Sequence, residues 1–205
     1  MKQDAEEKII NAARELFYEK GLTGVTVRDI ANKAEVNLAL LHYYFRTKDK
    51  IFEIVFKDAF GLLFRKLNNA LSSDVDLFER IKLIISSYIT TATKHPQLAS
   101  FIMHELSVNS DSIWRIIYSN NEKNYVDENY NRFFQEVIDA GEVGIIKKTD
   151  PKILFIDIIS LSLFPFVANT FITKFLYPKR KSEFNEMIKN RIDHVYELIV
   201  NSLNL

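Results

Sequence analysis

The chain is 205 residues long and balances 27 Lys and Arg against 27 Asp and Glu, so its formal net charge is zero. A neutral chain has little long-range attraction for nucleic acid, so any binding of that kind would depend on a local positive cluster. The lack of cysteine excludes disulfides and thiolate sites, and the low counts of 5 Gly and 4 Pro favour long helices.

An amphipathic helix is expected over residues 4–20, where apolar residues recur at the helical spacing i, i+3, i+4, i+7, i+8. Gly21 is placed to end this helix. Thr26 suits the N-cap of a second helix, because its hydroxyl can accept a hydrogen bond from a free backbone N–H. The expected inner faces are Ile9, Ala12, Ala13, Leu16 and Phe17 in the first helix, and Ile30, Ala31 and Ala34 in the second.

Asn37 is the expected N-cap of a third helix that runs to about Phe45, with Leu41, Tyr44 and Phe45 pointing inward. Its outer face then carries Leu38, Ala39, His42 and Tyr43. A small positive cluster follows at Arg46, Lys48 and Lys50, against Asp49 alone. Two short helices joined by a tight turn, with aromatic and basic residues exposed on the second, are typical of a helix-turn-helix whose second helix enters the DNA major groove.

The rest of the chain is expected to be helical, without strand patterns, repeats or a flexible linker. A fourth, long helix starts near Thr47, which suits its N-cap. Gly141 is the expected C′ residue of one later helix, and Pro165 is expected to kink another. The later helices are expected at residues 75–94, 97–108, 112–140, 150–176 and 182–203, which gives an all-α fold of about nine helices.

The most apolar run lies between Asp157 and Lys174 and is too short to span a bilayer, so we expect a buried helix there. The charged N-terminus lacks the pattern of a signal peptide, and we expect a cytoplasmic protein that binds no membrane. The four histidines share no metal-ligand spacing, and no phosphate loop or nucleophile motif occurs. We therefore expect no metal, no cofactor and no enzymatic activity.

The N-terminal region resembles the TetR family of helix-turn-helix transcriptional regulators. The resemblance covers about the first quarter of the chain and implies a DNA-binding domain at residues 1–47, followed by a ligand-binding and dimerisation domain at residues 48–205. Two residues depart from the family pattern and bear on the operator sequence: His42, where tyrosine is common, and Leu38, where a small residue or lysine is usual. The matching positions are Ala13, Leu16, Phe17, Gly21, Thr26, Val27, Ile30, Ala31, Ala34, Val36, Leu41, Tyr43, Tyr44, Phe45 and Lys48.

In such a motif the outer face of the third helix reaches base edges. His42 could donate a hydrogen bond to guanine or to a phosphate, and Leu38 and Ala39 could touch a thymine methyl group. Lys48 lies at a helix N-terminus, which favours a phosphate. The alternatives are ordinary surface roles for His42 and Tyr43, pairing of Arg28 with Asp29 or Glu35, and a mostly buried Tyr44. The expected DNA-binding residues are Thr26, Arg28, Asn37, Leu38, Ala39, His42, Tyr43, Tyr44 and Lys48.

The resemblance also implies a ligand pocket and a dimer interface in the C-terminal part. Aromatic residues at helical spacing are more often core than pocket, so the ligand residues are candidates only. These candidates are His104, Trp114, Tyr118 and Asn169. The last helix carries a narrow apolar seam, expected to form the dimer interface with the preceding helix, at Phe184, Ile188, Ile192, Val195 and Ile199.

The function implied is that of a homodimeric, sequence-specific regulator, a repressor that binds a near-palindromic double-stranded operator. Its two recognition helices would lie ~34–36 Å apart. A small hydrophobic or aromatic inducer would release it by binding the DNA-incompetent state more tightly. One alternative keeps DNA binding but places it under the control of a protein partner. The other is an all-α enzyme or a carrier of lipid or another small molecule.

Overall fold

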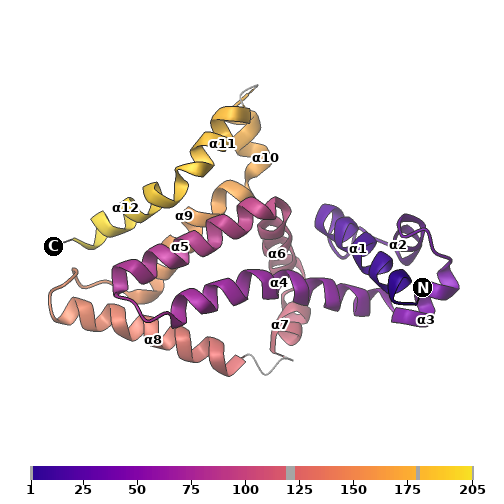
Figure 1. Cartoon of the computed structure of the whole chain (residues 1–205), viewed down its shortest axis with the longest axis horizontal. Helices are drawn as coiled ribbons and strands as arrows, with labels where there is room; N and C mark the ends of the chain where they lie inside the picture. Colours follow the sequence, from indigo (N-terminus) through magenta and orange to yellow (C-terminus); the bar gives the residue numbers. More distant parts are fainter. Residues whose placement is uncertain (1, 119–122, 179–180, 205) are drawn as a thin grey trace. The chain divides into compact units, whose positions relative to one another are not determined.

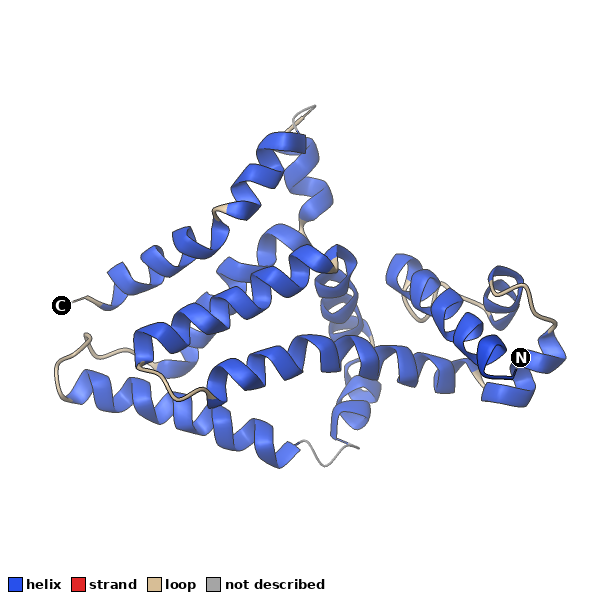
Figure 2. Ribbon diagram, viewed as in Figure 1, coloured by secondary structure: helices blue, strands red, loops and turns tan. Residues whose placement is uncertain are grey.

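The computed structural model describes residues 2–118, 123–178 and 181–204, and these ranges contain twelve α-helices (Figure 1) and no strand (Figure 2). The all-α prediction is confirmed. Contacts divide the chain into two compact units: Met1–Gly61 with Gln97–Asn120 (unit 1), and Leu62–Pro96 with Asn121–Leu205 (unit 2). The helix α4 (Lys48–Ser72) contributes residues to both units. The expected boundary between a DNA-binding domain at residues 1–47 and a ligand-binding and dimerisation domain at residues 48–205 is a division by function, and it stays a prediction.

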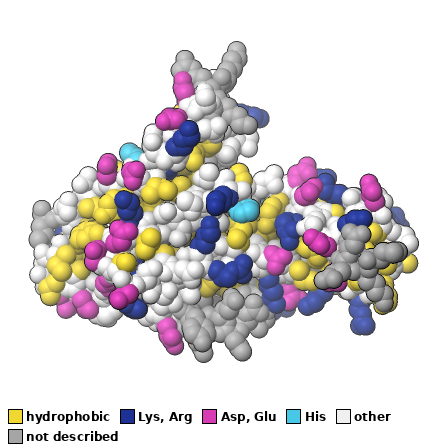
Figure 3. Space-filling model, viewed as in Figure 1, with side chains coloured by type: hydrophobic (Ala, Val, Ile, Leu, Met, Phe, Trp, Pro, Cys, Tyr) yellow, Lys and Arg dark blue, Asp and Glu magenta, His cyan; other side chains and the backbone are white. Residues whose placement is uncertain are grey.

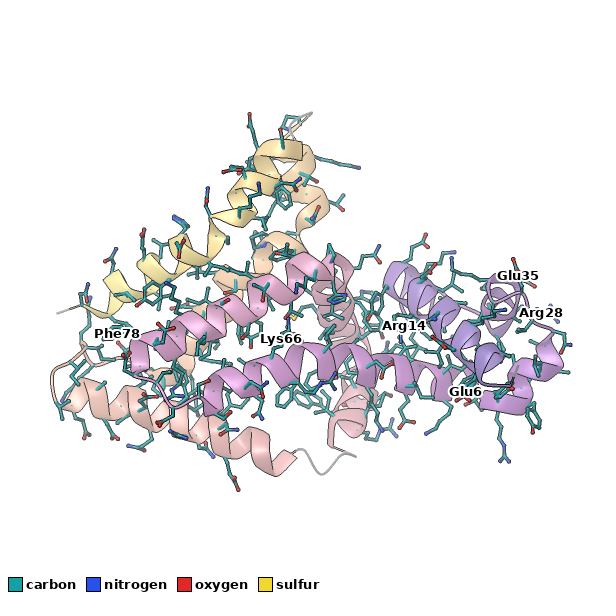
Figure 4. All side chains as sticks on the ribbon, in the orientation of Figure 1. Glu6, Arg14, Arg28, Glu35, Lys66 and Phe78 are labelled. Atoms are coloured by element: carbon teal, nitrogen blue, oxygen red, sulfur yellow. The ribbon has the colours of Figure 1, made fainter. Side chains whose placement is uncertain are left out.

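Unit 1 has an aromatic core between its N-terminal helices, α4 and α6. Phe17 of α1 meets Phe52 of α4 edge to face, with 5.3 Å between ring centroids, and Phe101 lies 6.1 Å from Phe52. The apolar stripe expected on α1 is buried there, which confirms its inward face. Arg14 of α1 (labelled in Figure 4) also pairs with Asp58 of α4 at 3.0 Å. The unit contains α1 (Lys2–Lys20), α2 (Val27–Lys33), α3 (Leu38–Phe45), the start of α4, nearly all of α6 (Pro96–Val108) and α7 (Ser110–Tyr118).

Unit 2 is centred on α5 (Leu77–Lys94), which packs against α9 (Pro151–Val167) and α12 (Arg191–Leu203). A second aromatic cluster joins α8 (Lys123–Glu142) to α9, where the rings of Tyr130 and Phe155 meet edge to face at 5.0 Å. The unit is completed by α10 (Asn169–Phe175) and α11 (Lys181–Lys189).

A buried arginine fixes the connection between α4 and α5 within unit 2. Arg80 is 2% exposed, and its guanidinium donates to the carbonyl oxygens of Leu71, Ser73 and Val75. The same group donates to Glu136 of α8 at 2.7 Å. A guanidinium is suited to this position because its planar fork offers five donors to several acceptors at once.

Three of the helix ends expected from local signals are confirmed. Thr47 accepts from the backbone N–H of Lys50 at 3.2 Å at the start of α4. Asp150 caps α9, with Pro151 in its first turn. His95 follows the last residue of α5, as the proline after it predicts.

The structure has more helices than the nine expected, because three long segments are described as pairs. The predicted helix at residues 112–140 corresponds to α7 and α8 on either side of residues 119–122, which lie outside the described ranges. The predicted helix at residues 182–203 is broken at Asn190, whose ψ of −2° departs from helical geometry. The predicted helix at residues 150–176 breaks at Ala168 and not at Pro165, because α9 continues through Pro165 to Val167.

Gly141 was wrongly predicted to end its helix, because α8 continues to Glu142. A Cβ atom at Gly141 would lie 3.3 Å from the Cα of Lys148, so this glycine admits a close approach of the chain that follows. Gly144 takes the left-handed backbone instead, with φ of 76°.

No single helix in the described ranges is long and apolar enough to cross a membrane. The pair α9 and α10 reaches that length and composition together, but the two helices are bent by 67°.

Candidate nucleic-acid interface

The helix α2 begins with a complete capping box. The Thr26 hydroxyl accepts from the backbone N–H of Asp29 at 3.2 Å and donates to the Asp29 carboxylate at 2.7 Å. The carboxylate also accepts from the backbone N–H of Thr26 at 2.8 Å. The hydrogen bond from the Thr26 side chain, and to a smaller extent that from the Thr26 backbone, hold the pKa of Asp29 below its ordinary value.

The turn between α2 and α3 is a Schellman motif whose left-handed residue is not glycine. The backbone N–H of Val36 donates to the carbonyl of Ala31, and that of Glu35 donates to the carbonyl of Asn32. Glu35 has φ of 56°, a region that costs an L-residue with a side chain about 1 kcal/mol. The turn brings α3 back across α2 and leaves Glu35 exposed (Figure 4).

The helix α3 separates an inward face from an outward face. Asn37 caps it by accepting from the backbone N–H of Leu40 at 2.8 Å. Leu41 and Phe45 are buried, as expected, while Tyr44 is only half-buried. Tyr43 is 69% exposed, and the whole outer face is accessible at Leu38, Ala39, His42 and Tyr43.

A tight turn at Arg46 joins α3 to α4. Arg46 has φ of 57° and ψ of −49°, and the backbone N–H of Thr47 donates to the carbonyl of Phe45 at 2.6 Å. These values define a classic γ-turn, which is rare and strained. Two further contacts join its centre to α3: the Arg46 N–H donates to the His42 carbonyl at 3.1 Å, and the His42 Nδ1 lies 3.0 Å from the Arg46 carbonyl oxygen.

Lys48 binds the protein itself. Its ammonium donates to the carbonyl oxygens of Leu22 and Val25, both at 2.8 Å. The backbone N–H of Leu22 in turn donates to Oε1 of Glu105, a fully buried carboxylate on α6, at 2.8 Å. The loop that precedes α2 is therefore held from α4 and from α6 within unit 1. Sequence reasoning missed these partners because they lie 26 and 83 positions apart in the chain.

The other residues expected to contact phosphate differ in their exposure and in their partners within the protein. The hydroxyl hydrogen of Thr26 is engaged by Asp29, so a phosphate would have to compete for it. Arg28 is exposed on α2 (Figure 4), and the carboxylate of Asp29 is occupied by Thr26. The ring of Tyr44 lies 5.4 Å from that of Tyr43 and 6.2 Å from that of Phe45. The DNA-contacting roles of these residues stay predictions.

Part of the positive charge around the motif is paired with acidic side chains. Lys57 pairs with Glu53 at 2.8 Å, and Lys50 pairs with the same carboxylate at 3.0 Å. These hydrogen bonds, the one from Lys57 most of all, lower the pKa of Glu53. Lys33 of α2 pairs with Glu15 of α1 at 2.8 Å. Basic and acidic side chains both occur over the face shown in Figure 3. Steering by long-range charge is therefore weak, and affinity must come from placed contacts.

The candidate ligand residues are not assembled into one described site. His104 and Trp114 are exposed residues of unit 1, whereas Asn169 is a half-buried residue of unit 2. The side chain of Tyr118 lies outside the described residues. A cavity of about 710 Å³ in unit 2 lies between α5 and α8, and it is not lined by His104, Trp114 or Asn169.

Polar groups buried in unit 2 were missed by the sequence analysis. The hydroxyls of Thr91 on α5 and Ser162 on α9 are fully buried and have no hydrogen-bond partner among the described residues. Nearby along the chain, burial raises the pKa of Tyr88, which hydrogen-bonds Tyr130. A single Thr or Ser within an apolar helical segment is common, so the sequence pattern did not distinguish these two residues from others.

The predicted dimer seam is largely covered by its own chain. Phe184, Ile188, Val195 and Ile199 are buried, and α12 packs against α5 and α9. Ile192 alone of the five is half-exposed. The seam therefore offers little surface to a second copy.

Comparisons with known proteins agree with the helix-turn-helix geometry. A family model described as "Bacterial regulatory proteins, tetR family" matches residues 9–55. The "Probable HTH-type transcriptional regulator YttP" of Bacillus subtilis (strain 168) is 31% identical over 182 residues, covering 86% of this chain and 84% of that protein. The chain therefore belongs to the TetR family of bacterial regulatory proteins and is a DNA-binding transcriptional regulator.

Solved structures share the fold over the whole length. HlyIIR, a hemolysin II transcriptional regulator, has a TM-score of 0.67 at 20% identity, covering 100% of this chain and 99% of that chain. FadR from Bacillus subtilis, in complex with stearoyl-CoA, has a TM-score of 0.63 at 20% identity, covering 97% and 100%.

Proposed function

We propose that the protein is a homodimeric repressor that reads a near-palindromic operator with the outer face of α3. The observation that carries this proposal is the division of α3: Leu41 and Phe45 fix the helix, while Leu38, His42 and Tyr43 are left exposed. A two-turn helix whose exposed side chains take no part in the core is suited to contact base edges. Basic residues near the motif would position it on phosphates without reading sequence.

Selection of bound DNA from a random pool tests this role. A near-palindromic consensus is expected, and replacing His42 and Tyr43 by Ala should abolish specific binding while non-specific binding is nearly retained. Equal loss of both would mean that these side chains do not read bases. Transcription from a promoter that contains the selected site then distinguishes a repressor from an activator.

Dimerisation is proposed to use the exposed faces of α9 and α12, in place of the buried seam. Along α9, Ile153, Ile156 and Phe164 recur at helical spacing and are 58%, 60% and 58% exposed. Leu198 of α12 is also exposed. Apolar residues left in one stripe of this kind are suited to a self-complementary interface, in which the helix pair of one copy packs on that of the other.

Charged substitutions distinguish the two faces. Ile156→Glu and Phe164→Glu should yield monomers in sedimentation experiments and lose high-affinity operator binding. Val143→Glu is the matched control, because Val143 is an exposed apolar residue of unit 2 outside this stripe. A dimer that survives both α9 substitutions would contradict the proposed interface.

An inducer is proposed to bind unit 2 between α5 and α9. The unpaired hydroxyls of Thr91 and Ser162 each leave about 1–3 kcal/mol of hydrogen-bonding free energy unused, which a polar group of an otherwise apolar ligand could recover. The shared fold of FadR, whose structure holds stearoyl-CoA, supports an apolar ligand with a polar end. Such a ligand releases DNA only if it prefers the DNA-incompetent state.

Thr91→Val and Ser162→Ala test this location, since both changes keep the side-chain volume nearly constant. Fatty acyl compounds of graded chain length would be screened for release of the operator from the wild type. The two variants should need more inducer and bind operator normally. A wild-type response that both variants retain in full would place the inducer elsewhere, and the earlier candidates His104, Trp114, Tyr118 and Asn169 would be next.

We also propose a cytoplasmic location, because a bacterial operator lies in that compartment.

A further inference from the structure

We propose that His42 reads its base pair as a hydrogen-bond acceptor, so that it selects a base with an exocyclic amine in the major groove, cytosine N4 or adenine N6. This inference rests on the proposed role of α3 in DNA recognition. It reverses the expectation from the sequence, in which His42 donates a hydrogen bond to guanine or to a phosphate.

The acceptor role follows from the other nitrogen of the ring. The Nδ1 atom of His42 lies 3.0 Å from the carbonyl oxygen of Arg46. A carbonyl oxygen has only lone pairs, so the nitrogen that faces it at this distance must carry the hydrogen. In the neutral ring the second nitrogen, Nε2, then has a lone pair and no hydrogen.

The backbone at Arg46 keeps this arrangement in place. Its γ-turn geometry, with φ of 57°, directs the Arg46 carbonyl back toward α3. The Arg46 N–H also donates to the His42 carbonyl at 3.1 Å, so residues 42 and 46 are joined in both directions. Rotation of the imidazole to present Nδ1 to DNA would break the side-chain bond and leave the strained turn with fewer contacts.

The position of His42 leaves Nε2 available to a base. The side chain is exposed on the outer face of α3, beside Tyr43. In the major groove, amine hydrogens are offered by cytosine at N4 and by adenine at N6, whereas guanine offers acceptors at N7 and O6. A lone pair on Nε2 therefore favours C or A on the contacted strand and disfavours the guanine acceptors.

The tautomer can be tested without DNA. Long-range ¹H–¹⁵N NMR spectra of the whole protein at pH 8, where histidine side chains are ordinarily neutral, should show His42 with its hydrogen on Nδ1. Assignment of the signals by comparison with His42→Gln makes the result specific to this residue. A neutral ring with the hydrogen on Nε2 would overturn the inference, whatever DNA the protein binds.

The base preference is tested with the selected operator at the same pH. The base pair contacted by His42 is the one at which His42→Ala loses discrimination. Replacing the C or A there by an analogue without the exocyclic amine should weaken wild-type binding about two- to tenfold, the range expected for one hydrogen bond. His42→Ala should show no such loss, while His95→Ala, the matched control at an exposed histidine of unit 2, should show the same loss as the wild type.

The outcomes separate this inference from the proposed function. Wild-type binding that is specific but prefers guanine at that position, or that ignores the missing amine, would overturn the acceptor role and leave the regulator role standing. Failure to select any specific DNA would overturn both. Conversion to a donor-only side chain gives a further check, since His42→Arg should shift the preferred base at this position to guanine.

Discussion

Replacing Lys48 by Met should destabilise unit 1 even when no DNA is present. The ammonium donates to the carbonyls of Leu22 and Val25, both at 2.8 Å, and thereby fastens α4 to the loop before α2. Hydrogen bonds with a charged donor contribute ~1.5–3 kcal/mol each, but the two carbonyls regain water when the half-buried side chain is lost. We therefore expect a loss of roughly 2 kcal/mol.

Urea unfolding followed by circular dichroism measures this loss. Lys50→Met is the matched control, because Lys50 forms an exposed pair with Glu53 at i+3, worth only about 0.3 kcal/mol. Unchanged stability in Lys48→Met would show that the two hydrogen bonds from the Lys48 ammonium do not stabilise the unit. Operator binding at several salt concentrations gives the second measurement. If the third N–H of the Lys48 ammonium contacts a phosphate, the dependence of log K on log[salt] should be weaker by about one in Lys48→Met than in the wild type.

Three further predictions concern other parts of the chain. Arg80→Met should cost about 3–5 kcal/mol in urea unfolding, because it removes the donor to three backbone carbonyls as well as to Glu136, whereas Met at the exposed Arg132 should cost little. Because folding lowers the pKa of Asp29, its contribution to stability is present above the unfolded carboxyl pKa of about 4 and is lost as pH falls through the lower folded value. Thr26→Val should raise that pKa in a carboxyl NMR titration and weaken the acid dependence of stability; an unchanged titration would contradict the capping box. Glu35→Gly should stabilise the turn between α2 and α3 by about 1 kcal/mol, and a destabilised variant would show that the left-handed backbone is not a source of strain.

The helix-turn-helix was predictable because its signals are local. The Thr26 and Asn37 caps act on backbone groups three residues away, and the buried stripe of α1 follows from helical spacing. The same argument placed His42 and Tyr43 on the outer face. Short-range chemistry of this kind is written in neighbouring residues, so one sequence suffices to infer it.

The remaining features depend on contacts and backbone angles that form only in the folded chain. The role of Lys48 depends on two carbonyls more than twenty positions earlier, and Gly141 admits the close approach of Lys148. The tautomer of His42 depends on the backbone angle of Arg46. An apolar seam shows which face of a helix will be covered, but it does not show whether the cover is the same chain, and that is why Val195 and Ile199 were assigned to a dimer.

The two faces of α3 have a consequence for how such regulators diverge. Leu41 and Phe45 hold the helix in place, and Asn37 starts it, while Leu38, Ala39 and Tyr43 carry no part of the core. After gene duplication, substitutions at these outer positions could accumulate with little loss of folding free energy. Two copies of the gene could thus come to occupy different operators while each kept its fold. His42 would change more slowly than its neighbours, because it also supports the turn at Arg46.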